Sequence, residues 1–367
     1  MMQNSPGSDF SRSAPKWLRH VGLQSWLFIG ILLMTAVILV ILATLNEIVT
    51  PLIISLLFAI LSRPLVDWLE QHKVSRSLAT VLTMVLILII TTGLIAIIIK
   101  GVWQQAPEIG YQLRAGWVSL QISLLQFNIQ LPSVNTVSTE LSSALPTIFE
   151  GLFALLSSTV TTLIGLFVGL YFGAFILFFL LRDTAQIETW IAQRISLNPQ
   201  VGTAIVKDAG HTVLTYFRGT GLTALITSMV VAVPLVILKV PLVGAILILY
   251  FFTSFIPYLG AWIAGAFAVL IALGAGGVQT ALIILAAVII SNGALQAIVS
   301  SWALGSLLKI HPLVIFLVTI IAGMVGGILS MILAVPITAI VLQVAVRLRL
   351  EGVFSETGAK LPVAQQN

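Results

Sequence analysis

The chain has 367 residues, of which 59% are hydrophobic and only 8% are charged. An average soluble domain carries roughly a quarter charged residues, so this composition is typical of a protein with several membrane-spanning helices. Cysteine is absent, and so are HExxH, GxSxG and P-loop motifs, which excludes the chemistry that they support. We therefore expect no enzymatic activity, metal or cofactor. Because the basic residues gather at the ends of apolar runs, the net charge of +5 gives no reason to expect nucleic acid as a partner.

The first hundred residues predict a polar tail followed by membrane helices. Residues 1–22 are rich in serine and proline, and we expect a disordered cytoplasmic tail. Residues 23–100 predict membrane helices, the last of which, at 78–99, is long enough to cross a bilayer. Within them, 63–77 is amphipathic and contains Trp68, which predicts a linker helix at the cytoplasmic membrane surface.

The middle of the chain alternates between polar and apolar segments. Residues 101–146 form a polar insert that the count of spans places outside the cytoplasm, as a connecting cap or as a part of a gate. Residues 147–181 predict a membrane span and 182–218 a charged cytoplasmic connector with an amphipathic helix. Glycines four residues apart in this span let a second helix, from the same chain or another copy, pack closely. They are Gly165, Gly169 and Gly173.

The last third, 219–348, predicts a membrane core that contains two broken hairpins. One hairpin covers 241–273 and is interrupted at "FIPYLG" (255–260), and the other covers 312–346 and is interrupted at its glycines. Proline and glycine disrupt helices, and a broken backbone in the membrane is tolerated only where protein or water surrounds it. One crossing between the hairpins would make them an inverted pair, as in secondary transporters.

Together these segments predict an all-α polytopic membrane protein with about eight transmembrane or half-length helices. Two of its hairpins, both in the C-terminal third, are expected to be broken and re-entrant. The positive-inside rule places Lys309, Arg347 and the tail at 349–367 in the cytoplasm. We therefore expect a multi-pass protein of the inner membrane, surrounded by lipid, with both termini cytoplasmic.

Three further stretches of the sequence are characteristic: "PLIISLLFAILSRPLVDWLEQHKVSRSLATVL" (51–82), "FIPYLG" (255–260) and "KIHPLVIFLVTIIAGMVGGILSMILAVP" (309–336). Together they resemble the autoinducer-2 exporter family of bacterial permeases. In that family a proline precedes the second helix, an arginine ends the amphipathic linker, and a Leu-His-Pro phrase leads into a glycine-rich hairpin. The resemblance implies a membrane transporter that exports signalling molecules such as autoinducer-2 or exchanges sodium for protons, and a homo-oligomer.

One stretch departs from the pattern of the family. Members often carry an acidic residue ahead of the Leu-His-Pro phrase, whereas "SNGALQAIVSSWALG" (291–305) has Asn292 and Gln296 and no acid. Ion-coupled antiporters commonly use an intramembrane carboxylate that binds the proton and the cation in turn. The departure therefore weakens the case for sodium or lithium exchange here.

The candidate residues for a substrate or ion pathway lie at the breaks and on the helix between them. Asn292 and Gln296 share one helix face, where they could bind a polar solute or hydrogen-bond a neighbouring helix. The broken backbone at 257–260 could bind a solute or form a plain hairpin tip. The full set is Pro257, Tyr258, Gly260, Asn292, Gln296, Gly326 and Gly327.

Three titratable residues are candidates for proton coupling. Glu47 could be an intramembrane carboxylate or could lie in water at an outer turn. Asp208 lies among the charges of the connector, and His311 could relay protons or cap the second hairpin. The functions that remain are export of a small polar solute of the autoinducer-2 type, sodium(lithium)/proton antiport, and a membrane scaffold without transport.

Overall fold

The computed structural model describes residues 46–103, 105–125, 160–195, 198–298 and 310–350, with scattered positions between 22 and 44. Predictions for 1–21, 126–159, 299–309 and 351–367 lie outside the described residues. The chain divides into a short unit, Met1–Thr50, and a large one, Pro51–Asn367. The features below belong to the large unit.

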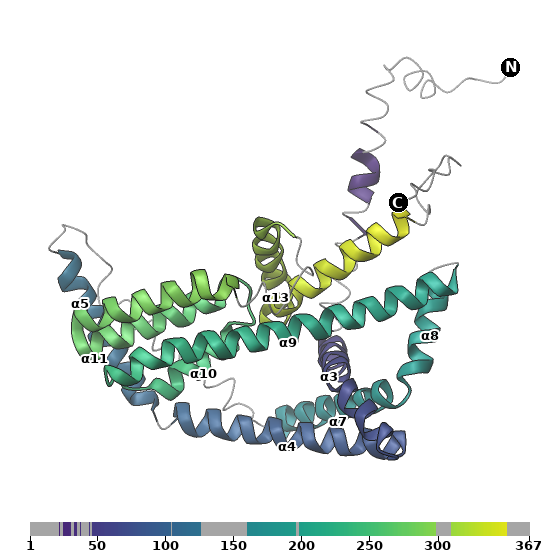
Figure 1. Ribbon diagram of the computed structural model, residues 1–367, viewed down its shortest axis with the longest axis horizontal. Helices are drawn as coiled ribbons and strands as arrows, with labels where there is room; N and C mark the ends of the chain where they lie inside the picture. Colours follow the sequence, from purple (N-terminus) through teal and green to yellow (C-terminus); the bar gives the residue numbers. More distant parts are fainter. Residues whose placement is uncertain are drawn as a thin grey trace, which may run out of the picture. The chain divides into compact units, whose positions relative to one another are not determined.

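The described part of the chain is helical throughout and contains no strand (Figure 1). In chain order the helices are α3 (Asn46–Gln71), α4 (Arg76–Trp103), α5 (Ala106–Leu125), α7 (Val160–Arg182), α8 (Thr184–Ile195), α9 (Pro199–Ile237), α10 (Val243–Thr253), α11 (Gly260–Ile290), the π-helix η1 (Ser291–Leu295) and α13 (Pro312–Leu350).

Five of the described helical segments are long and apolar enough to cross a membrane. A sixth span is counted if α7 and α8, which meet at an angle of 84°, are taken as one broken segment. The prediction of an all-α polytopic membrane protein is confirmed. The count of about eight helices and the re-entrant geometry of the hairpins stay predictions.

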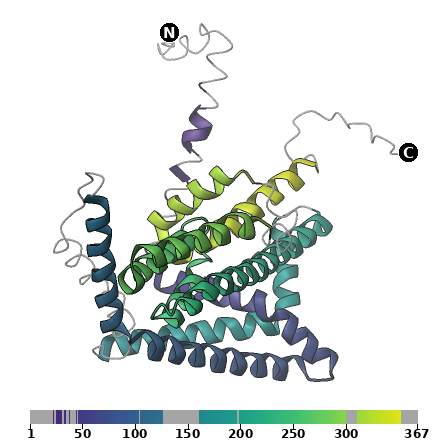
Figure 2. The same ribbon diagram turned by 60° about the vertical axis from the view of Figure 1, so that its left-hand side comes forward.

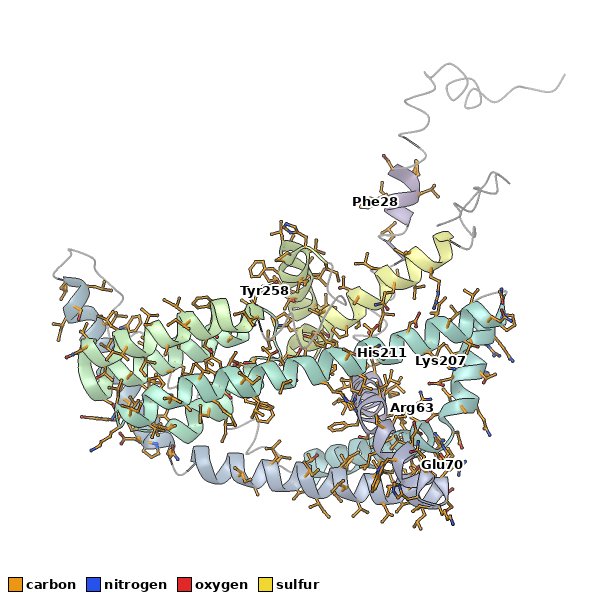
Figure 3. All side chains as sticks on the ribbon, viewed as in Figure 1. Phe28, Arg63, Glu70, Lys207, His211 and Tyr258 are labelled. Atoms are coloured by element: carbon orange, nitrogen blue, oxygen red, sulfur yellow. The ribbon has the colours of Figure 1, made fainter. Side chains whose placement is uncertain are left out.

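Helices α3, α4 and α7 pack around a small apolar core and are joined by arginines at one end. Val66, Ala79 and Leu181 are buried in this core. Arg76 Nε donates to the Arg182 carbonyl at 2.8 Å, so α4 satisfies a backbone acceptor at the end of α7. Arg63 of α3 pairs with Glu188 of α8, and Figure 3 shows Arg63 close to this junction.

Helix α9 is a single rod of 39 residues, about 58 Å long at 1.5 Å per residue. That length is nearly twice the roughly 30 Å of a bilayer core. Its charged residues, which include Lys207, Asp208 and Arg218, lie in the first half, and the second half is apolar. The predicted boundary between a connector at 182–218 and a membrane core from 219 therefore falls inside one continuous helix.

Three backbone breaks shape the C-terminal third. Residues 254–259 separate α10 from α11, Gly277 (φ 71°) divides α11, and Gly326 with Gly327 (φ 66°) divides α13. The two halves of α11 lie against each other, because a Cβ on Gly265 would meet Val288 Cγ1 at 2.5 Å. The two halves of α13 diverge from their break (Figure 1).

Helix α5, within the predicted insert at 101–146, packs tightly on α11 near the Gly277 turn (Figure 2). A Cβ on Gly116 would lie 2.2 Å from the Leu270 carbonyl oxygen, and one on Gly274 would lie 2.3 Å from the Gln112 carbonyl oxygen. The two backbones approach closely only because neither glycine has a side chain.

Candidate functional site

A cavity of about 470 Å³ lies among α9, the α10–α11 break, η1 and α13. This volume is within the range of small-molecule sites, roughly 300–1,000 Å³. Its described lining contains no charged side chain. The lining residues are Tyr216, Thr220, Thr223, Ala224, Thr227, Ser254, Pro257, Tyr258, Trp262, Asn292, Gly293, Gln296, Ala297, Pro312, Ile315 and Val335.

The break between α10 and α11 forms one side of the cavity. Pro257 and Tyr258 line it, and Tyr258 adopts a left-handed backbone conformation with φ 61°. Such a conformation is uncommon for a residue with a side chain and marks a position that the surrounding structure holds in place. Figure 3 shows Tyr258 at this break, near the first half of α13.

Gly260 begins α11 directly beside the cavity and makes the break sterically feasible. A Cβ at this position would lie only 1.5 Å from the Thr253 carbonyl oxygen. The chain therefore folds back on the end of α10 at a distance that only glycine permits. Gly260 does not line the cavity but shapes its wall.

Asn292 connects three helical segments at the π-helix. The Tyr250 hydroxyl donates to Asn292 Oδ1, and Asn292 Nδ2 donates to the Ala261 carbonyl at 3.0 Å. Nearby, Ser291 Oγ donates to the Thr227 carbonyl at 3.1 Å. Asn292 thus lines the cavity and also hydrogen-bonds its neighbours, and π-helices of this kind occur frequently at functional sites.

Gln296 lies one turn beyond Asn292 and also lines the cavity. Its side chain is partly buried and has no hydrogen-bond partner among the described residues. A carboxamide presents two donors and an acceptor. Gln296 is therefore an amide of the cavity wall that could hydrogen-bond a solute.

Sequence reasoning missed the wall that α9 contributes. Thr220, Thr223 and Thr227 line the cavity, and Tyr216 continues the same face one turn earlier. Threonines at positions i, i+3 and i+7 lie on one face of a helix. Their spacing in an apolar segment was a signal that could have identified this wall.

The remaining predicted pathway residues, Gly326 and Gly327, divide α13 and do not line the cavity. Their break turns the chain, and residues on both sides of it, Pro312 and Val335, reach the cavity. The structure thus brings Pro257, Tyr258, Asn292 and Gln296 together, and the two glycines lie apart from them.

Two of the candidates for proton coupling, Asp208 and His311, do not line the cavity. Asp208 is paired with Arg347, and His311 Nδ1 accepts from the backbone amide of Leu313 at 3.2 Å, beside the start of α13. With this hydrogen bond, His311 caps the first turn of α13 through one of its two ring nitrogens. Glu47 lies in α3, and its side chain is outside the described residues.

The glycines of α7 have different surroundings. A Cβ on Gly173 would lie 3.6 Å from Ser55 Oγ, which donates to the Gly173 carbonyl at 2.8 Å. Its neighbour is thus α3 of the same chain. Gly169 has open space beside it, and the side-chain position of Gly165 lies outside the described residues.

Several apolar helices, repeated helix breaks and a cavity lined in part by polar side chains define a multi-pass membrane protein of the transporter class. The sequence comparison is more specific. A family model described as AI-2E family transporter matches residues 28–349, and the chain belongs to this family.

Named relatives cover most of the chain at low identity. A protein of Mycobacterium tuberculosis (strain CDC 1551 / Oshkosh), named "Putative transport protein MT0215", is 26% identical over 88% of this chain and 89% of its own length. "Putative transport protein YueF" of Bacillus subtilis (strain 168) is 27% identical over 79% of this chain and 81% of its own. The "AI-2 transport protein TqsA" of Escherichia coli (strain K12) is 25% identical over 80% and 84%.

Proposed function

We propose that this protein exports a small polar solute of the autoinducer-2 type across the inner membrane, through a path that includes the cavity. The observation that carries the proposal is the cavity itself, where Pro257, Tyr258, Asn292 and Gln296 from separate broken segments meet. Transporter sites commonly lie at discontinuous helices, because freed backbone groups and polar side chains can bind a solute there. One relative, TqsA, is named as an AI-2 transport protein.

The orientation follows from charge. The positive-inside rule favours cytoplasmic termini and a cytoplasmic position for the ion-paired junction of α3, α4, α7 and α8. Helix α10, with 11 residues, is shorter than the roughly 20 residues that cross a bilayer, which supports a re-entrant first hairpin. The proposal includes a homo-oligomer surrounded by lipid, which the mass of the purified protein in nanodiscs would test.

Efflux from proteoliposomes tests the proposal directly. Vesicles containing the purified chain are loaded with autoinducer-2, and we expect its release to exceed that from protein-free vesicles. The variant Gln296→Ala should reduce the rate, whereas Gly110→Ala on α5, which has open space around it, should not. Release at the protein-free rate from vesicles with folded protein would refute export of this solute.

Sodium(lithium)/proton exchange is the second candidate, and proton flux distinguishes it from export. In the same vesicles an imposed pH gradient is challenged with sodium, lithium or potassium. Asp208 is ion-paired and His311 is hydrogen-bonded at a helix start, and neither lines the cavity. We expect no cation-dependent dissipation. Dissipation would establish antiport and direct attention to Glu47.

A further inference from the structure

Two of the threonine hydroxyls that α9 contributes to the cavity wall already donate their protons to backbone carbonyls. Thr223 Oγ1 donates to the Gly219 carbonyl at 2.8 Å, and Thr227 Oγ1 donates to the Thr223 carbonyl at 2.8 Å. At the α10–α11 break, Ser254, which also lines the cavity, donates from its Oγ to the Tyr250 carbonyl at 2.6 Å. A hydroxyl has one proton and two lone pairs, so each of these groups, with its proton engaged, can only accept from a solute.

Other groups of the lining can act as donors. Gln296, Tyr258 and Trp262 carry N–H or O–H groups that have no hydrogen-bond partner among the described residues. A solute that fits both kinds of group needs several donors and several acceptors. Hydroxyl groups supply both, since each can donate to a threonine oxygen and accept from an amide or phenol.

Charged solutes fit the same wall poorly. A carboxylate or phosphate only accepts, so it would face hydroxyl oxygens whose protons are already engaged. Among the described residues, the lining offers an anion no cationic side chain and a cation no carboxylate. An ion moved from water into such a site loses hydration without gaining a counter-charge, which is strongly unfavourable.

We propose that this cavity selects uncharged, polyhydroxylated solutes and that the Thr223 and Thr227 hydroxyls determine the selection as acceptors. The inference rests on the proposed function and narrows its substrate class. It identifies Thr223 and Thr227 on α9 as specificity-determining residues. It also predicts that charged analogues of a neutral substrate are rejected.

Equilibrium binding to the purified full-length protein in nanodiscs tests the inference. The probes are radiolabelled erythritol, which is neutral, and erythronate, its carboxylate counterpart with the same number of carbons. We expect erythritol to bind and erythronate to bind at least roughly tenfold more weakly, since its charge would be unpaired. Equal binding of the two, binding of erythronate alone, no binding of either, or displacement of erythritol by sodium would overturn the inference.

A matched set of valine variants assigns the effect to the cavity. Thr223→Val and Thr227→Val should each weaken erythritol binding about three- to tenfold, as expected for one lost hydrogen bond. Thr319→Val is the control, because Thr319 is buried and its hydroxyl donates to the Ile315 carbonyl at 2.7 Å, but it does not line the cavity. If all three variants bind alike, the two hydroxyls do not determine selection.

The two proposals can fail independently. Selective erythritol binding without any solute release from proteoliposomes would remove the export proposal and leave the specificity intact. If the vesicles released an anionic solute in preference to neutral ones, transport would be supported and the proposed specificity would be refuted.

Discussion

Individual glycines allow the helices of this chain to be interrupted at particular positions. At Gly260 the α11 backbone approaches the Thr253 carbonyl so closely that a methyl group has no space. At Gly327 the reason is conformational, since φ is 66° and a Cβ at this position would have no atom within 4 Å. Glycine is thus required for two different reasons, which are a close backbone approach at Gly260 and a left-handed backbone conformation at Gly327.

The substitution Gly260→Ala should be severely destabilising. Its Cβ would meet backbone rather than a side chain that can rotate away, so we expect a loss of about 3 kcal/mol or more in the free energy of unfolding. Unfolding by denaturing detergent, followed by circular dichroism, measures the change. Gly244→Ala on α10, where nothing lies within 4 Å, is the control and should change stability by less than about 1 kcal/mol. Equal effects would contradict the steric account.

Pairs of helices are held together by backbone proximity as much as by apolar burial. On α5 the side chains of Ile109 and Leu113 join the large core formed with α9, α10 and α11. Gly116 and Gly274 then bring the α5 and α11 backbones together. Dispersion between closely packed surfaces is the main attraction available to helices in lipid, so such small residues are stabilising.

Gly116→Ala should therefore separate α5 from α11. The added methyl would lie 2.2 Å from the Leu270 carbonyl oxygen, and the helices must move apart to accommodate it. We expect faster proteolysis within α5 and about 1–3 kcal/mol lower stability. Gly110→Ala on the same helix has open space and serves as the matched control. A protected α5 in the Gly116 variant would show that the close approach does not hold the pair.

Across the molecule, α9 and α13 are joined along a seam that starts at the cavity. Tyr216 packs with Ile315 and Val335 at the cavity wall. Further along, Thr212 Oγ1 donates to Gln343 Oε1 at 2.9 Å, and Asp208 pairs with Arg347. Figure 3 shows Lys207 and His211 on this same half of α9. A solute leaving the cavity along this seam would have to separate the two helices.

Locking this seam should stop transport. Because the chain has no native cysteine, Thr212→Cys with Gln343→Cys can be bridged by a short bifunctional thiol reagent. We expect solute release from proteoliposomes to fall to background and to return when the bridge is reduced. The control bridges Ser55→Cys to Gly173→Cys between α3 and α7, which leaves the seam free. Undiminished release with a complete bridge at 212 and 343 would show that the seam stays closed during transport.

Much of the fold and part of the candidate site could be predicted from local patterns. The apolar runs and the glycine and proline positions predicted the helices and the breaks at 254–259 and at Gly326 and Gly327. Asn292 and Gln296 were predicted as one polar face, and both line the cavity. These features depend on residues near one another in the chain, so periodicity and backbone preference are sufficient to predict them.

The sequence alone established a helical, multi-pass membrane protein and the breaks at 254–259 and at Gly326 and Gly327, because hydrophobicity and backbone restrictions act locally. It did not predict the break at Gly277 within α11. Only the tertiary structure established that Thr223, Thr227 and Asn292 line one cavity and that Asp208 pairs with Arg347. The Asp208–Arg347 contact spans 139 residues, and it depends on how α9 packs against α13. Packing is set by the fit of whole surfaces, and no single stretch of residues encodes it.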